Sequence, residues 1–265
     1  MEEGGFVKPI RIYQCEDTPE GIFSAVYDAG KSGYGHDYIQ IENVKPGSYQ
    51  EQRLFSEYIS VESDSEKMEK VLRSVRGKIS WEVYEYIIRA AASVEEDKAD
   101  VIYHFIVEGF RIGAKVTSAL QIPCVQRMFE INRRVKNEAH YYLEFLRFQE
   151  VQLKQPVLLA VFEPNNAVLP FVVPHFADRL NPEWFVIYDK NHQQAAFHAP
   201  GQQWYIRKLE PEEGKQLEEW EETKEEYVDL WKAFFETIAI KERANSDLQR
   251  NNMPLHYRKH MTEFL

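Results

Sequence analysis

The residue types best suited to acid–base chemistry lie in one short run, Pro174-His175-Phe176-Ala177-Asp178-Arg179. This run follows the apolar residues Leu169 to Val173, which predict a short strand. Polar side chains at a strand end often line functional sites, and a histidine near an aspartate offers proton transfer or metal ligation. The structural alternative stays open: Asp178 caps a turn, Arg179 forms an ion pair and His175 bonds to backbone.

A second polar group is predicted on a long helix from about Pro123 to Phe148. His140, Glu144 and Arg147 are spaced to share one helix face. They would form either the polar wall of a cleft, with His140 as a further catalytic candidate, or a hydrogen-bond cluster between helices. Neither His192 nor His198, on a predicted hairpin, has a metal-ligand spacing relative to His175, so no metal site is expected.

The residues from Lys241 to His260 have the opposite charge to the chain as a whole. Five Lys or Arg against two acids give +3, whereas the protein carries −11. Such a segment suits nucleic acid or an acidic partner, or it pairs with the protein's own acidic stretch, Glu210 to Glu226. The candidate nucleic-acid contacts are Arg250, Asn251, Asn252, Tyr257, Arg258, Lys259 and His260. Arg133 and Arg134 could extend this patch, although such charge runs usually form a solvated face.

Composition limits the class of protein. The 265 residues are 44% hydrophobic and 14% aromatic, which is enough for a buried core. The sequence has no long apolar run and no signal peptide, so we expect a cytoplasmic protein without a membrane partner. Two cysteines are too few to hold an iron–sulfur cluster alone, and no cofactor is expected. Walker A, GxGxxG, GxSxG, HExxH and paired CxxC motifs are absent from the sequence.

The elements that must position these residues predict an α+β fold. Apolar residues at helical spacing predict a helical layer over about residues 64–148. From Val151 the period changes to 2, which predicts a mainly antiparallel sheet over about 155–208. The acidic stretch is then predicted to be a linker that leads into a long closing helix from Tyr227. We therefore expect a strand–helix start and helical region in 1–150, with the sheet, linker and closing helix in 151–265, in one compact unit.

Four stretches carry a resemblance to a known family. They are GIFSAVYDA (Gly21 to Ala29), NEAHYYLEFLRFQE (Asn137 to Glu150), PHFADRLNPEWFVIYD (Pro174 to Asp189) and Leu230 to Phe264, which closes with YRKHMTEF. Together they resemble an uncharacterised bacterial family described as a probable DNA metabolism protein. The resemblance implies a companion of a radical-SAM protein of DNA repair or modification. It also implies kinship with a region fused ahead of uracil-DNA-glycosylase-like domains. It supplies no catalytic residues.

Three hypotheses follow for the function. The first is an accessory or nucleic-acid-binding component of a DNA repair or modification system that works with the radical-SAM partner. Its basic terminal segment would bind either DNA or the partner enzyme. The second is an enzyme acting on a nucleotide or damaged base through the His/Asp/Arg cluster. The third is a protein-only scaffold whose basic terminus pairs with Glu210 to Glu226.

Overall fold

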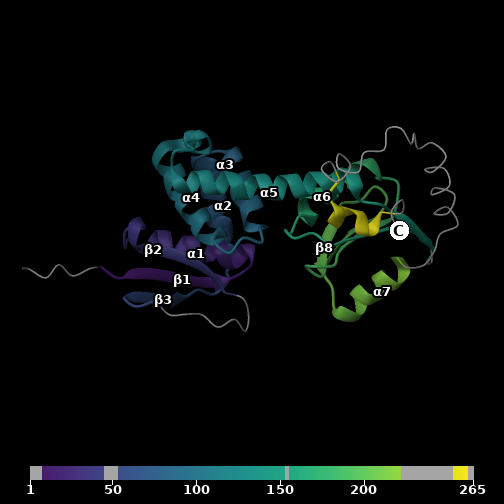
Figure 1. Ribbon diagram of the computed structural model, residues 1–265, viewed down its shortest axis with the longest axis horizontal. Helices are drawn as coiled ribbons and strands as arrows, with labels where there is room; N and C mark the ends of the chain where they lie inside the picture. The colour runs from purple at the N-terminus through teal and green to yellow at the C-terminus, as the bar shows by residue number, and fades with distance from the viewer. Residues whose placement is uncertain (1–7, 45–52, 153–154, 222–252, 262–265) are drawn as a thin grey trace, which may run out of the picture. The chain divides into compact units, whose positions relative to one another are not determined.

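The computed structural model describes residues 8–44, 53–152, 155–221 and 253–261 (Figure 1). The chain divides into two compact units, Met1–Lys136 (unit 1) and Asn137–Leu265 (unit 2). The division falls within the long helix α5 (Pro123–Phe145). The predicted α+β class is confirmed, because each unit combines its own β-sheet with helices.

A three-stranded parallel sheet organises unit 1, with the strand order β2-β1-β3. The strands are β1 (Ile10–Glu16), β2 (Ile39–Val44) and β3 (Ser56–Ser60). Helix α1 (Pro19–Lys31) connects β1 to β2, and the Thr18 side chain accepts the Gly21 N–H at its start. A short 3₁₀ turn, η1 (His36–Tyr38), precedes β2. The carboxyl ends of β1 and β2 therefore lie side by side at one edge of the sheet.

The helical layer of unit 1 follows the predicted apolar spacing. It comprises α2 (Ser65–Lys78), α3 (Trp81–Ala91), α4 (Lys98–Ile112), the 3₁₀ helix η2 (Gly113–Ser118) and the first part of α5. Asp64 and Ser80 cap α2 and α3 by accepting backbone N–H groups of the first turns. The buried side chains of α1 to α5 form one core with those of β1 and β2.

A five-stranded mixed sheet organises unit 2, in the strand order β4-β5-β6-β7-β8. The strands are β4 (Gln149–Gln152), β5 (Pro156–Phe162), β6 (Phe185–Asp189), β7 (Gln194–His198) and β8 (Tyr205–Lys208). Strands β5 and β6 are parallel, and the other neighbouring pairs are antiparallel. The sheet is thus mainly antiparallel, as predicted, with one parallel pair that the short connections did not predict.

The parallel pair exists because its connection is a helix, and here the sequence prediction is wrong. Residues Leu169–Arg179 form helix α6, not a strand followed by a polar loop. Leu169, Val172, Val173 and Phe176 are buried at i, i+3, i+4 and i+7, which is helical spacing. Pro170 sits in the first turn, where its missing N–H costs nothing. The sequence did not reveal this helical spacing, because a short apolar run with adjacent valines suits a strand as well as a helix.

Two further boundaries differ from the predictions. Helix α5 ends at Phe145, so Arg147 lies beyond the helix on which it was expected. The acidic stretch is not a linker, since its residues Pro211–Glu221 form helix α7. Leu217 of α7 is buried against the sheet in a core with Leu159 and Val161 of β5. The predicted closing helix from Tyr227 lies outside the described residues.

Helices cover both faces of the unit 2 sheet, α7 on one and α6 on the other (Figure 1). Phe148 contacts both Phe176 of α6 and Phe185 of β6, with ring centroids 5.0 and 6.0 Å apart. Across the described part of the chain, no helix combines the length and apolar character needed to cross a membrane.

Candidate functional site

The predicted catalytic cluster is exposed on helix α6. His175, Asp178 and Arg179 are all exposed, and no ion pair joins them to one another or to any other described residue. His140 is exposed on α5, where its Nε2 lies 3.2 Å from Glu144 Oε1. The described contacts do not join His140 to the α6 residues. A site was expected here because Pro174 was predicted to follow a strand. Pro174 instead lies within helix α6, so this reason does not hold.

Polar residues do follow strand ends in unit 2, but at the carboxyl ends of the parallel strands β5 and β6 and not at Pro174. Such edges commonly hold functional groups in sheets with parallel strands. Asp189 ends β6 and is fully buried, and its Oδ2 lies 2.8 Å from His192 Nδ1. The His192 backbone N–H also donates to Asp189 Oδ1 over 3.1 Å. The carboxylate therefore fixes both the turn and the orientation of the imidazole.

This arrangement can perform proton transfer. An imidazole that is oriented through Nδ1 by a buried carboxylate is suited to proton transfer, because the carboxylate stabilises the imidazolium form. Burial raises the pKa of Asp189, while the hydrogen bond from His192 lowers it. The His192 side chain is 28% exposed. Solvent therefore reaches part of the ring.

Glu138 forms a second buried carboxylate site in the same unit. It lies on α5 and accepts the backbone N–H groups of Asn165 (2.7 Å) and Asn166 (3.0 Å) in the loop after β5. The Asn166 side-chain amide also donates to it. These bonds hold the β5–α6 loop against α5, so Glu138 has a positioning role. Glu138 also contributes to raising the pKa of Asp189.

An ion-pair chain runs along this edge. Glu163 directly follows β5, and its Oε2 lies 2.5 Å from Lys259 Nζ. Its Oε1 lies 3.6 Å from Lys190 Nζ, and Lys190 also pairs with Glu218 of α7 over 2.6 Å. The predicted pairing of the basic terminus with Glu210 to Glu226 is therefore indirect in the described residues: Glu163 and Lys190 stand between Lys259 and Glu218.

The described end of the basic segment, residues 253–261, packs on unit 2. Its 3₁₀ helix η4 (Leu255–His260) places Tyr257 against the rings of Tyr141 and Tyr142, with both centroid separations 4.9 Å. Tyr257 is 8% exposed and Met261 is fully buried. Tyr257 is thus a packing residue and not an exposed ring for base stacking.

The other predicted nucleic-acid contacts have different settings. Arg258 donates to the Met253 carbonyl over 3.1 and 3.2 Å, whereas the Lys259 side chain is 60% exposed beside Glu163. Arg250, Asn251 and Asn252 lie outside the described residues, as does the side chain of His260.

The helix α5 arginines of unit 1 are partly neutralised. Arg127 donates to Glu95 over 2.5 Å and to both oxygens of Asp97 over 2.7 and 2.8 Å, and Arg134 also pairs with Glu95. The Arg127 guanidinium lowers the pKa of Glu95 and of Asp97. Arg133 is exposed. This face therefore offers less positive charge than the sequence predicted.

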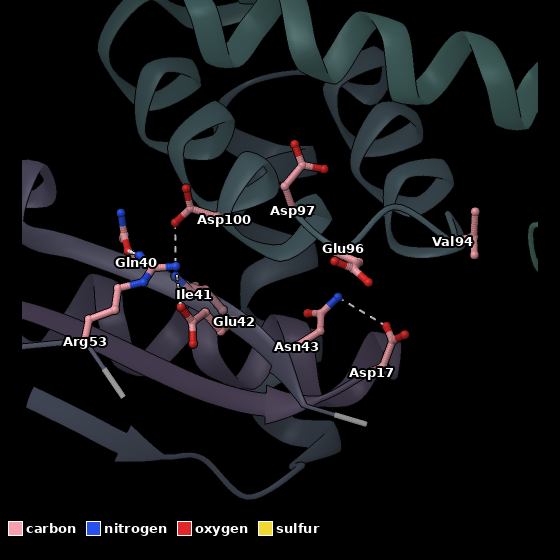
Figure 2. A pocket seen from close by; sticks show the side chains of 10 residues that line it. All are labelled: Asp17, Gln40, Ile41, Glu42, Asn43, Arg53, Val94, Glu96, Asp97 and Asp100. Carbon is pink, nitrogen blue, oxygen red and sulfur yellow. Dashed lines mark hydrogen bonds and ion pairs between the residues drawn. The ribbon is translucent and has the colours of Figure 1, made fainter. Parts of the chain in front are cut away.

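Unit 1 has its own cavity, of about 470 Å³, at the carboxyl ends of β1 and β2 (Figure 2). Five carboxylates line it, those of Asp17, Glu42, Glu96, Asp97 and Asp100. Figure 2 shows Asp100 on α4 reaching down to β2, where it accepts the Ile41 N–H over 3.0 Å. Burial raises the pKa of Asp100. The excess of carboxylates repels phosphate, so this cavity does not suit a nucleic-acid backbone.

Among the residues that the structure describes, no group of three or more His, Cys, Asp or Glu side chains is placed to hold a metal ion. Two pairs were not predicted from the sequence, His192–Asp189 and Glu163–Lys259. The first has a local signal, since Asp189 ends an apolar run and His192 follows three residues later in a turn. The second joins residues 96 positions apart and has no such signal.

The fold defines a two-unit α+β protein in which both the His192–Asp189 pair and the Glu163–Lys259 pair lie at the carboxyl ends of β5 and β6 in unit 2. A family model described as a domain of unknown function (DUF4130) matches residues 96–263. The chain belongs to this family. The match covers α4, α5 and the whole described part of unit 2, including both the His192–Asp189 pair and the terminal segment. No curated protein matches the chain significantly.

Proposed function

We propose that this protein is an accessory component of a bacterial DNA repair or modification system, works with a radical-SAM partner, and contacts nucleic acid through unit 2. The proposal rests on the position and the exposure of Lys259. A docked segment holds this cation at the ends of two parallel strands, and its side chain is nevertheless 60% exposed. The resemblance of four stretches of sequence to a DNA metabolism family supplies the biological setting.

A phosphate oxygen can reach Lys259 while the ion pair with Glu163 stays in place, because 60% of the Lys259 side chain is exposed whereas Glu163 is 21% exposed. Lys190 and His256 add positive or proton-donating groups in the same unit, and His256 is exposed. The contact would position nucleic acid without reading its sequence, because phosphates carry no base identity.

The test is a salt-titrated binding assay with single- and double-stranded oligonucleotides, with and without the radical-SAM partner. Lys259→Gln should weaken binding uniformly across sequences. It should also reduce the slope of log K against log salt by about 0.7 to 0.9, the share of one phosphate contact. Lys115→Gln, on the exposed side of η2 in unit 1, is the matched control. Co-purification of the partner without any DNA binding would favour the scaffold alternative.

A second candidate function rests on the His192–Asp189 pair: hydrolysis of a nucleotide or damaged base. His192 would take a proton from water, the water oxygen would attack the substrate, and the proton would pass to the leaving group. This relocates the predicted catalytic cluster from α6 to the end of β6. Product formation from damaged oligonucleotides that is lost in His192→Ala, while DNA binding is retained, would support it. Equal product formation by both proteins would refute it.

A further inference from the structure

A groove of about 490 Å³ lies in unit 1 between helices α1, α2 and α4. It is separate from the acidic cavity of Figure 2, since the two share no lining residue. Val26, Val71 and Ile106, one from each helix, are buried and line it. Phe110, 51% exposed, adds an aromatic wall. The volume and apolar lining are those of a small-molecule site.

Cationic groups stand beside this apolar lining. Lys31 of α1 and Lys70 of α2 both line the groove, and their Nζ atoms lie 5.9 and 6.0 Å from the ring centroid of Tyr27. Lys70 has an exposed pair with Glu66 over 3.4 Å, which contributes little. Two ammonium groups around one aromatic ring, in a chain of net charge −11, form a local site for an anion that also carries an apolar part.

A hydrogen-bonded pair completes the lining. His36 Nδ1 lies 2.7 Å from the Tyr103 hydroxyl, and both residues line the groove. Tyr103 is buried, which raises the pKa of its hydroxyl, and this hydroxyl holds the exposed His36 ring in place. Gly33 and Gly35, with φ of 63° and 98°, form the turn that presents His36. The site therefore combines an apolar surface, two cations and a few polar groups.

Gly30 leaves the groove open. A Cβ added to this residue of α1 would meet no atom within 4 Å. A large side chain at position 30 would therefore occupy the groove without displacing the core. This offers a way to fill the site that leaves both lysines in place.

We propose that this groove binds a mononucleotide, with the base against the apolar lining and Phe110, and the phosphate between Lys31 and Lys70. A base supplies the flat aromatic face that such walls favour, and a phosphate supplies the charge that the lysines complement. The inference is independent of the DNA contact of unit 2, because every lining residue belongs to unit 1.

Calorimetric titration of the full-length protein tests this inference with each of the four deoxynucleoside 5′-monophosphates, with thymidine, and with inorganic phosphate. We expect saturable binding of at least one monophosphate with Kd of about 1 mM or tighter, and weaker binding of thymidine and of phosphate. The double variant Lys31→Gln/Lys70→Gln should weaken binding about tenfold. Gly30→Leu should abolish it.

The control variant Lys78→Gln/Lys115→Gln removes the same charge from exposed positions outside the groove and should bind like the unaltered protein. Circular dichroism establishes that each variant is folded. Absence of saturable binding by all four monophosphates, equal weakening in both double variants, or unchanged binding in Gly30→Leu would overturn the inference. Phosphate binding as tightly as the nucleotides would also overturn it, because the base would then contribute nothing.

Discussion

Tyr257→Ala should undock the terminal segment from unit 2. The Tyr257 side chain is 8% exposed and packs against Tyr141, Tyr142 and Phe145, with centroid separations of 4.9, 4.9 and 6.1 Å. A buried tyrosine removes about 150 Å² or more from water, which at about 25 cal/mol per Å² contributes about 3–4 kcal/mol. The aromatic contacts add about 0.5–1.5 kcal/mol.

The loss should act locally, because the contacts removed join one short 3₁₀ helix to the surface of α5 and leave the buried core of unit 1 intact. A loss of about 3 kcal/mol raises the population of the undocked segment by roughly 100-fold. Hydrogen exchange followed by mass spectrometry should show faster exchange in a peptide covering 253–261, including the amide of Met261, which donates to Arg258. Peptides of unit 1 should exchange as before.

Tyr257→Phe is the matched control. It keeps the ring contacts and removes a hydroxyl that makes no hydrogen bond within the described residues, so the segment should stay docked. Equal protection of residues 253–261 in Tyr257→Ala and the unaltered protein would refute the reasoning. It would mean that Met261 and the Lys259 ion pair hold the segment without the ring.

Three further predictions concern unit 1. Arg127→Met should lower the free energy of unfolding by about 1–3 kcal/mol at neutral pH, because Asp97 loses its ion-pair partner and Glu95 keeps only Arg134; the exposed pair of Arg73 gives a control variant with little effect. Arg127 lowers the pKa of Glu95 and of Asp97 from their ordinary values of 4.5 and 3.8, so its contribution to the free energy of unfolding is present above those values and is lost as the pH falls below them. The urea unfolding curves of Arg127→Met and the unaltered protein should therefore converge in acid. A difference that stays constant with pH would contradict this. Gly21→Ala should destabilise the protein by about 1–3 kcal/mol in thermal unfolding, because its Cβ would lie 2.6 Å from the Glu16 carbonyl oxygen, and an unchanged Tm would show that α1 can shift freely. Burial raises the pKa of Cys15 to about 12, so iodoacetamide should label it at pH 8 only after unfolding; rapid labelling of the folded protein would contradict its burial.

The fold was predictable from sequence where apolar residues keep the helical spacing over several turns. Helices α2 to α4 show apolar residues at helical spacing over three or more turns, and caps such as Asp64 and Ser80 mark their starts. The short helix α6 was not predictable in this way. Its apolar residues include two adjacent valines, so the same short run suits a strand or a helix.

The candidate site was predictable only in its residue types. A His/Asp pair and a basic terminus were expected, but the pair that forms is His192 with Asp189, created by the turn between β6 and β7. The partner of Lys259 is Glu163, which follows β5. Pairings of this kind depend on which strands are neighbours, and strand order is a property of the whole fold.

The most direct test of the proposed DNA contact is the salt dependence of duplex binding, measured in parallel for the unaltered protein, Lys259→Gln and Lys115→Gln. The proposal predicts that only Lys259→Gln loses affinity at low salt, with a slope of log K against log salt reduced by about 0.9. Identical slopes and affinities for all three proteins, or no duplex binding by the unaltered protein at low salt, would contradict it.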